Sequence, residues 1–444
     1  MAKEKRQNFD PTKPVNLIDL TCEQVDSIYN YMLSKDMPEI MWTVDIQKAM
    51  WEEVRDAHKN GKKLVAFGGP VPVTILRAFD CVPFFLDTIP TRIASMEDLS
   101  ARFIDETEKN APASMCAIDK AQLGAVLKDE VGVEVDGFVH ATVPCDSARI
   151  AYPIMERKLN VPSFTFDCPF RHDEKGYQYV ADQIESFIPW MEELTGLKWD
   201  DDRKAKFREI NLKSNTAYDL LTKLGDLRKK KPCVLPGRML VLNELIASHA
   251  GTDMIIDMLQ AQYDSALMLT DMGMTATRCP DGQQPYRAVL MQNMLWSNTG
   301  IMDWMEKTYG CITVMDGFGY QTGVIFDDVD DWERVKIQTA QMMLHTPMIH
   351  GATGPTQYWL DVIDKMYDEF SVNVSIFMGH VGCKHTWATG KIVTDFIQEK
   401  YGLPTLYVDV DAIDPRYKSN DELRAQIGEY MESVVGAHNF SKDQ

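Results

Sequence analysis

Short apolar stretches recur along the chain, and between them lie stretches in which apolar residues repeat at three- and four-residue steps. The first pattern predicts β-strands and the second predicts α-helices. In the first half of the chain the expected strands lie at 64–67, 82–87, 136–145 and 162–169. Because strands that alternate with helices form parallel sheets, we expect residues 61–176 to fold as one doubly wound α/β lobe.

The second half of the chain has the same plan. Its expected strands lie at 286–293, 311–319, 372–379 and 405–411, separated by helices near 299–308, 330–343, 355–370 and 390–400. A final helix is expected at about 420–436. Residues 276–444 are therefore predicted to form a second parallel α/β lobe that ends in a C-terminal helix.

Helical patterns occupy the remaining segments. Residues 1–60 read as a helical lead-in, and residues 177–275 read as a helical connector between the two lobes. The predicted fold class is therefore α/β, with two doubly wound, Rossmann- or flavodoxin-like lobes and helical N-terminal and connecting segments.

Composition narrows the possible partners of the chain. The 444 residues carry a formal net charge of −20, so there is no basic surplus to neutralise nucleic acid or an anionic membrane. The start of the chain lacks the apolar core of a signal peptide, and no run approaches the roughly 18 uninterrupted apolar residues of a membrane helix. We therefore expect a cytoplasmic protein that binds neither nucleic acid nor membrane.

Three of the nine cysteines share a position relative to the expected elements. Cys145 and Cys383 each stand between the end of a strand and the start of a helix, and Cys116 lies near the start of a helix. In open α/β sheets ligands bind at the carboxyl edge of the strands, and a helix start favours the thiolate, which is the form that binds metal. Cys168 also ends a strand and is the main rival as a ligand.

The long separations between these cysteines match neither a ferredoxin run nor a zinc ribbon. Cys116 and Cys145 belong to the first lobe and Cys383 belongs to the second, so a shared metal would lie in the cleft between the lobes. Three thiolates leave one position open. That position would be a catalytic water site on zinc, or an iron free to bind substrate oxygen in a 4Fe-4S cluster.

Other residues are candidates for the same cleft. His385 lies two residues after Cys383 and could transfer a proton or hydrogen-bond to the helix start. Trp296, Asp316 and Tyr320 follow strands of the second lobe, and Thr353 lies in the glycine-containing start of a helix. We expect these four residues to line a substrate pocket.

Several segments resemble one enzyme family. The segments HVGCKHTWATG and YGLPTLYVDVDAIDPRYKSNDELRAQIGEYMES are similar to the C-terminal signature of the 2-hydroxyacyl-CoA dehydratase and benzoyl-CoA reductase family. DGFVHATVPCDSARIAYPIMERKLNVPSFTFDCP is similar to its middle segment, and MEELTGLKWDDDRKAKFREINLKSN to its helical connector. The resemblance covers most of residues 60–438. One departure is the turn Gly68-Gly69-Pro70, which offers none of the hydroxyls that the family often places there.

The resemblance implies the larger, cluster-bearing subunit of an oxygen-sensitive enzyme. Cys116, Cys145 and Cys383 would hold a 4Fe-4S cluster, beside a homologous smaller subunit and an acyl-CoA substrate. A separate ATP-hydrolysing iron–sulfur activator would supply single electrons. In the dehydratases the electron gives a ketyl radical, and loss of the 2-hydroxyl converts an (R)-2-hydroxyacyl-CoA to an enoyl-CoA. The chain has no G-x-x-x-x-G-K-[ST] motif, so ATP would bind only to the activator.

Three alternatives stay open at this point. A benzoyl-CoA reductase subunit would carry the same cysteines and reduce an aromatic ring. A double-cluster electron-transfer or reductase protein of the same family would recruit Cys168 or others, and a zinc-dependent hydrolase would use the open position for water.

Overall fold

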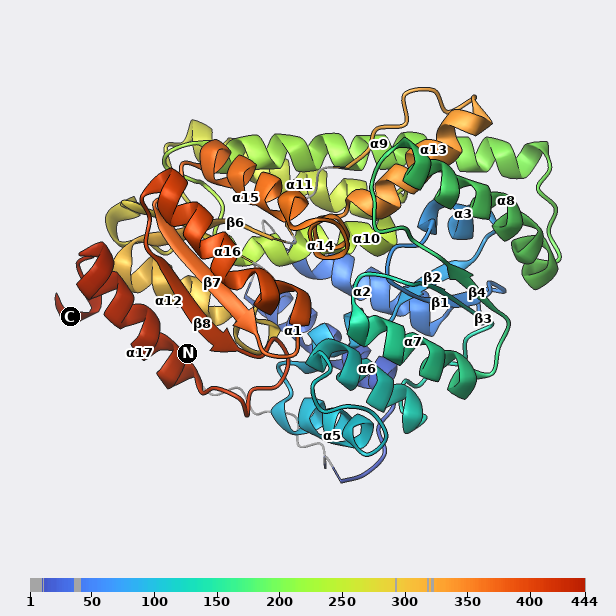
Figure 1. Cartoon of the computed structure of the whole chain (residues 1–444), viewed down its shortest axis with the longest axis horizontal. Coiled ribbons are helices and arrows are strands. Elements are labelled where there is room, and N and C mark those ends of the chain that lie inside the picture. The colour runs from blue at the N-terminus through green and yellow to red at the C-terminus, as the bar shows by residue number, and fades with distance from the viewer. Residues whose placement is uncertain are drawn as a thin grey trace.

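Two four-stranded parallel sheets, one in each half of the chain, organise the structure (Figure 1). This computed structural model describes residues 10, 12–35, 41–291, 294–317, 319–320 and 323–443. The inner strands of both sheets are almost entirely buried and are built from apolar runs, which is the pattern expected of parallel strands covered by helices. The predicted α/β class with two similar lobes is confirmed.

The first sheet has the strand order β2-β1-β3-β4. Its strands are β1 (Leu64–Gly68), β2 (Val82–Phe85), β3 (Gly137–Ala141) and β4 (Ser163–Phe166). Ala66 on the central strand β1 is paired with Phe84 on one side and Phe138 on the other. The helices of this lobe are α3 (Val73–Ala78), α4 (Thr88–Ile93), α5 (Glu97–Glu108), α6 (Ala117–Leu127) and α7 (Asp146–Leu159).

The second sheet has the same plan, in the order β6-β5-β7-β8. Its strands are β5 (Tyr286–Met291), β6 (Cys311–Asp316), β7 (Val374–His380) and β8 (Thr405–Val410). The helices are α12 (Gly300–Tyr309), α13 (Trp332–His345), α14 (Pro347–Thr353), α15 (Thr356–Phe370), α16 (Lys384–Tyr401) and α17 (Asn420–Glu429). In both lobes the chain order reverses between the first and third strands, which is where open sheets bind ligands.

Two helix boundaries differ from the sequence prediction. Helix α16 begins at Lys384, six residues before the predicted start, because its first turns are only partly buried and carry no apolar periodicity. In the predicted helix at 420–436, the α-helix ends at Glu429 and a π-helical turn, Tyr430–Val435, continues it.

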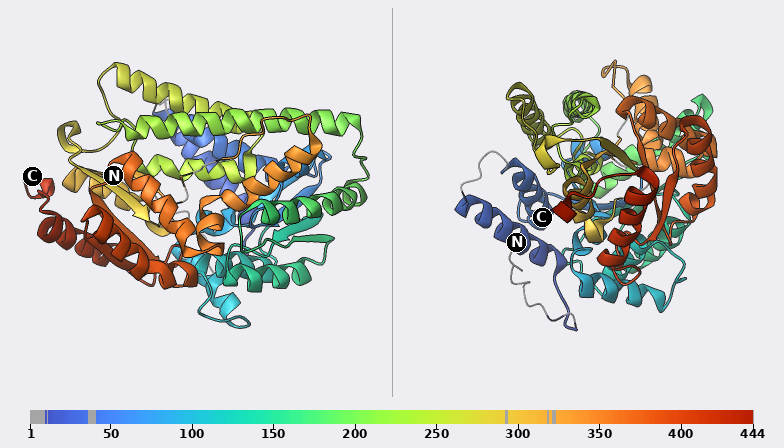
Figure 2. Two further views of the ribbon diagram at one scale, coloured as in Figure 1. Left: turned by 45° about the horizontal axis from the view of Figure 1, so that its top comes forward. Right: turned by 90° about the vertical axis from the view of Figure 1, so that its left-hand side faces the viewer.

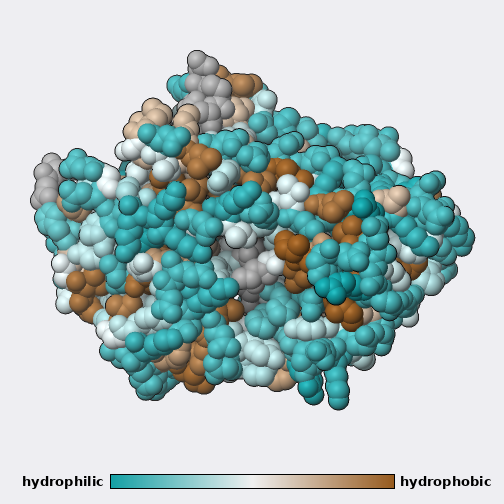
Figure 3. Space-filling view, turned by 90° about the horizontal axis from the view of Figure 1, so that it is seen from above, coloured by the Kyte–Doolittle hydropathy of each residue, from teal (hydrophilic) through white to brown (hydrophobic). Residues whose placement is uncertain are grey.

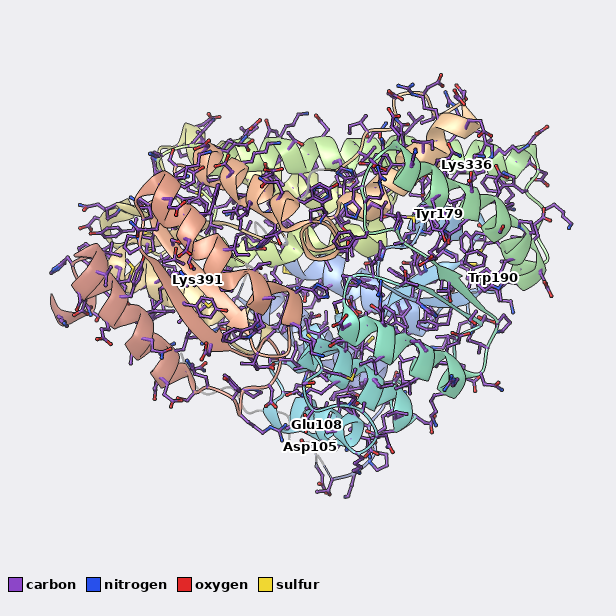
Figure 4. All side chains as sticks on the ribbon, in the orientation of Figure 1. Asp105, Glu108, Tyr179, Trp190, Lys336 and Lys391 are labelled. Atoms are coloured by element: carbon purple, nitrogen blue, oxygen red, sulfur yellow. The ribbon has the colours of Figure 1, made fainter. Side chains whose placement is uncertain are left out.

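Helices outside the two sheets join the lobes. The connector contains α8 (Glu174–Thr195), α9 (Asp201–Lys229), α10 (Ile246–His249) and α11 (Asp253–Asp271). Figures 1 and 2 show α9 running along the length of the molecule, across both lobes. Helix α13 follows β6 in the chain but packs in the same core as β1, β3 and α8. Its Lys336 (Figure 4) forms an ion pair with Glu185 of α8. The domain boundaries at residues 60, 176 and 275 stay a prediction.

The N-terminal lead-in forms α1 (Leu17–Ser34) and α2 (Trp42–Arg55), and residues 1–9, 11 and 36–40 of it lie outside the described residues. Apolar side chains of both helices belong to the same buried core as β1, β2 and α6. Hydrophilic side chains cover most of the face shown in Figure 3, in keeping with the acidic composition. Among the described helices, none has both the length and the apolar character that a membrane crossing requires.

Candidate functional site

A cavity of about 620 Å³ lies where the two lobes meet. Its wall combines residues from both sheets' carboxyl edges, from the connector and from α2. Most of the wall is apolar or aromatic, including Trp51, Phe67, Tyr152, Trp296 and Trp359. Cys116, Cys145 and Cys383 all line this cavity.

The three cysteines occupy equivalent positions in their local structures. Cys116 is the residue before α6, Cys145 the residue before α7, and Cys383 the residue before α16. In none of the three helices does a side chain cap the N-terminus. The first backbone N–H groups of each helix lie at the same end of the helix as its cysteine. The structure therefore brings the three predicted cysteines to one cavity, each at the positive end of a helix.

The backbones of the two lobes touch beside these cysteines. A Cβ added to Gly382 would lie 2.7 Å from the Cα of Cys116 and 2.7 Å from the carbonyl oxygen of Met115. The Cys116 amide donates to the Ser147 hydroxyl at 2.7 Å, which joins the α6 start to the α7 start. A glycine at position 382 thus allows the loop after β7 to approach the first lobe.

Replacing Gly382 with alanine is expected to push the lobes apart at this junction. The added methyl would meet backbone atoms, which cannot swing away, so we expect a loss of about 1–3 kcal/mol in the free energy of unfolding. Gly225→Ala is the matched control, because a Cβ there has nothing within 4 Å and the residue lies inside helix α9. Chemical unfolding of both variants checks this, and a Gly382→Ala protein as stable as Gly225→Ala would contradict the close approach.

The electrostatics of the site oppose free thiolates. Burial raises the pKa of Cys116 well above the ordinary value, and the charges of Asp119, Cys383 and Cys145 raise it further. Burial and the charge of Asp119 likewise raise the pKa of Cys145. The amides of Ala148 and Ser147 have a smaller, opposite effect and lower it. The thiolate form of these cysteines needs a positive centre beside it.

Thiolates are metal ligands, so the chemistry of these three side chains is compatible with a metal centre. Within the described ranges, however, no group of three or more His, Cys, Asp or Glu side chains lies close enough together to hold a metal ion. Ligation of a 4Fe-4S cluster or of a zinc ion by these cysteines therefore stays a prediction.

Two further carboxyl groups in the cavity wall were not predicted from the sequence. Asp119, near the start of α6, lies 3.9 Å from the Cys145 sulfur, and burial with the charge of Asp87 raises its pKa to about 8. Asp87 follows β2, and burial raises its pKa to about 6. One oxygen of Asp87 has no hydrogen-bond partner among the described residues. The cavity therefore holds a carboxyl group that changes charge near neutral pH.

The other predicted site residues divide into two groups. His385 and Trp296 line the cavity, with the Nε2 atom of His385 4.0 Å from an oxygen of Asp146. Asp316, Tyr320 and Thr353 are buried and are not among the lining residues. Asp316 accepts from the Gly319 amide at 2.7 Å, and Thr353 donates to the Ile349 carbonyl at 2.6 Å. Contact of these three residues with substrate stays a prediction.

Cys168 and the glycine turn also have clear positions. Cys168 is buried in the core under α8, where burial raises its pKa to about 12, and it does not line the cavity. Gly69 has φ +74°, and a Cβ there would lie 2.6 Å from the Val143 carbonyl oxygen, so the turn requires glycine. Thr74 of α3, four residues after this turn ends, is also among the residues that line the cavity.

Comparison with known proteins identifies related sequences. The family model described as 2-hydroxyglutaryl-CoA dehydratase, D-component, matches residues 70–434. One benzoyl-CoA reductase subunit of Thauera aromatica is 18% identical over 437 residues, covering 91% of this chain and 97% of the relative.

Two dehydratase subunits match shorter parts of the chain. The (R)-phenyllactyl-CoA dehydratase alpha subunit of Clostridium sporogenes is 23% identical over 198 residues, or 42% of this chain and 46% of the relative. The (R)-2-hydroxyglutaryl-CoA dehydratase alpha subunit of Acidaminococcus fermentans is 28% identical over 97 residues, or 21% of this chain and 20% of the relative. Since the family model covers most of the sequence, the chain belongs to the 2-hydroxyglutaryl-CoA dehydratase D-component family, among the subunits of 2-hydroxyacyl-CoA dehydratases and benzoyl-CoA reductases.

Proposed function

We propose that this chain is the cluster-bearing subunit of an oxygen-sensitive 2-hydroxyacyl-CoA dehydratase, a lyase that removes water from an (R)-2-hydroxyacyl-CoA to give an enoyl-CoA. The observation that carries the proposal is the meeting of Cys116, Cys145 and Cys383, from two lobes, around one cavity. These residues would hold a 4Fe-4S cluster. When bound, a cluster with one open iron position supplies a Lewis acid and a one-electron donor.

The residues of this chain would bind the thioester and manage its protons. The aromatic and aliphatic wall excludes water from the acyl group, which protects a reactive intermediate from side reactions. Asp87 is placed to accept the β-proton, because its carboxyl faces the cavity and titrates near neutral pH. His385, which lines the cavity beside Cys383, would give a proton to the departing 2-hydroxyl group so that it leaves as water.

The proposal includes two protein partners. Each matched relative is named as one subunit of its enzyme, so this chain would work beside a second, homologous subunit. A separate ATP-hydrolysing iron–sulfur activator would deliver single electrons. The sequence has no phosphate-binding loop for ATP, which is in keeping with this division.

Reduction of an aromatic acyl-CoA is the second candidate function. It is favoured by one observation, namely that the Thauera aromatica reductase subunit is matched over nearly its whole length. The aromatic cavity wall suits a ring as well as it suits an alkyl chain.

Anaerobic purification with metal analysis tests the proposal. About four irons per chain, with the broad absorbance of an iron–sulfur protein, are expected. About eight irons would favour the double-cluster alternative, and a colourless, iron-free protein would refute every iron-based function. Incubating the reduced complex and activator with a 2-hydroxyacyl-CoA and with benzoyl-CoA then separates water loss from ring reduction.

A further inference from the structure

Arg92 lines the cavity and has no carboxylate partner among the described residues. It lies in the last turn of α4, and its guanidinium Nη2 donates to the Gln24 side-chain oxygen at 3.0 Å. In the part of the chain that the structure describes, no Asp or Glu forms an ion pair with it, and its Nε is buried without a hydrogen-bond partner. Burial lowers the pKa of Arg92, with no negative charge nearby to offset this effect.

The arginine that shares the cavity with it is bound differently. Arg238 makes two contacts of 3.0 Å with the carboxylate of Asp303, so its charge is already satisfied. Lys384 also lines the cavity, but its side chain is exposed to solvent, where water can balance the charge. A partly buried cation is costly unless an anion pairs with it. Arg92 is thus the cavity cation that lacks both a paired carboxylate and full exposure.

The groups beside Arg92 make it the dominant donor on this part of the wall. The hydroxyls of Thr88 and Thr91 donate to the carbonyls of Phe85 and Thr88, and the Gln47 amide donates to the Thr43 carbonyl. These groups are therefore already engaged, whereas the guanidinium keeps donors for an incoming oxyanion. Asp87 precedes the same short helix, so Arg92 lies about 8 Å farther along its axis.

We propose that Arg92 binds an oxyanion of the acyl-CoA substrate and so sets which thioesters the cavity accepts. The inference rests on the proposed function for its substrate class. Two parts of an acyl-CoA have this chemistry: a carboxylate at the far end of the acyl group, and the phosphates of CoA. The planar guanidinium pairs with either through two parallel hydrogen bonds. Gln24 and the α2 residues of this wall precede residue 70, where the family match begins, so the lead-in helices shape this subsite.

Binding of unreactive thioesters tests the inference on the full chain, purified anaerobically. Isothermal titration calorimetry with glutaryl-CoA, pentanoyl-CoA and pentanoyl-pantetheine separates the two oxyanions. The first two probes differ in the acyl carboxylate, and the last two differ in the phosphates of CoA. We expect Arg92→Gln to bind the probes that carry the recognised oxyanion about 10- to 100-fold more weakly than the wild type does. This is the range for the loss of one charge-assisted hydrogen-bonded pair. Arg92→Lys keeps the positive charge but lacks the two parallel N–H donors of the guanidinium. Its affinity is expected to lie between those of the wild type and Arg92→Gln.

Each outcome has a defined meaning. Weakening for glutaryl-CoA alone assigns the acyl carboxylate, and equal weakening for both CoA thioesters with none for the pantetheine thioester assigns a CoA phosphate. Unchanged affinity for all three probes in Arg92→Gln overturns the inference. Arg157→Gln, an exposed arginine of α7 outside the cavity, is the matched control and should bind like the wild type.

Iron content separates this result from the proposed function. Arg92→Gln should retain the wild-type iron, because the residue does not contact the three cysteines. A wild-type chain with four irons and no Arg92-dependent binding overturns only the inference. An iron-free chain that still shows Arg92-dependent binding refutes the proposed function and leaves the inference standing.

Discussion

Replacing Cys145 with serine is expected to reduce the iron content from about four atoms per chain to near zero, with loss of turnover. Cys145 stands at the N-terminus of α7, where the nearby Ser147 and Ala148 amides act to lower the pKa of its thiol. An alcohol does not ionise in this buried place, so the cluster would lose one of its three anchors. Cys116→Ser and Cys383→Ser should give the same result, because all three cysteines line one cavity.

Cys168→Ser is the control for this result. Cys168 also follows a strand, but its side chain is packed in the core beneath α8 and away from the cavity. The variant should keep its iron, although the buried hydroxyl will cost some stability. Iron analysis and visible absorbance of the four variants, with circular dichroism as a check on folding, decide the assignment. Loss of iron from Cys168→Ser with retention in a folded Cys145→Ser would contradict it.

The sequence was sufficient to locate the strands and the cysteines because both depend on local pattern. Parallel strands are buried on both faces, so β1, β3, β5 and β7 appear as apolar runs. Cys145 and Cys383 follow β3 and β7, and any residue directly after such a strand lies at the carboxyl edge. The carboxyl edges of the two sheets lie together because of tertiary packing, which a local sequence pattern does not reveal. This packing depends on the close approach of the two lobes at Gly382.

The sequence did not show which residues at the ends of the strands reach the cavity. Trp296 follows the central strand β5 and lines the cavity, whereas Asp316 is the last residue of the outer strand β6 and does not. Gly317, the next residue, does line the cavity, so one position along the chain decides the contact. Such a difference depends on tertiary packing and leaves no periodic signal in the sequence.

Polar residues of the first lobe were missed for a related reason. Asp87 was included in an expected strand at 82–87, where a terminal acid looks like an ordinary strand end. Arg92 lies in α4, whose six residues are too few to show helical periodicity. The usable signal was an acid at the carboxyl edge, directly after β2.

Asp87→Asn is expected to lower turnover by about 10²- to 10⁴-fold, the usual contribution of a positioned general base. Because burial raises the pKa of Asp87 to about 6, wild-type turnover should rise with pH through about 6 and then level off. The amide cannot accept the β-proton, so the variant should be slow at every pH and lack this rise. The other ionisable groups beside it are Asp119 and Tyr152, and the charge of Asp87 raises the pKa of both. Initial rates measured between pH 5 and 8 for both proteins check this.

The same substitution should stabilise the folded chain, which a merely structural aspartate would not do. A carboxyl whose pKa is raised on folding contributes stability below pH 4 that is lost as the pH rises through about 6. At pH 7.5 the asparagine removes that penalty, worth about 1–2 kcal/mol once water in the cavity screens part of the charge. Iron content should not change, because Asp87 makes no contact with the three cysteines. The assignment would be contradicted if Asp87→Asn unfolded more easily than the wild type and its turnover still rose with pH. The proton acceptor would then be another residue of the cavity, and His385 is the next residue to replace.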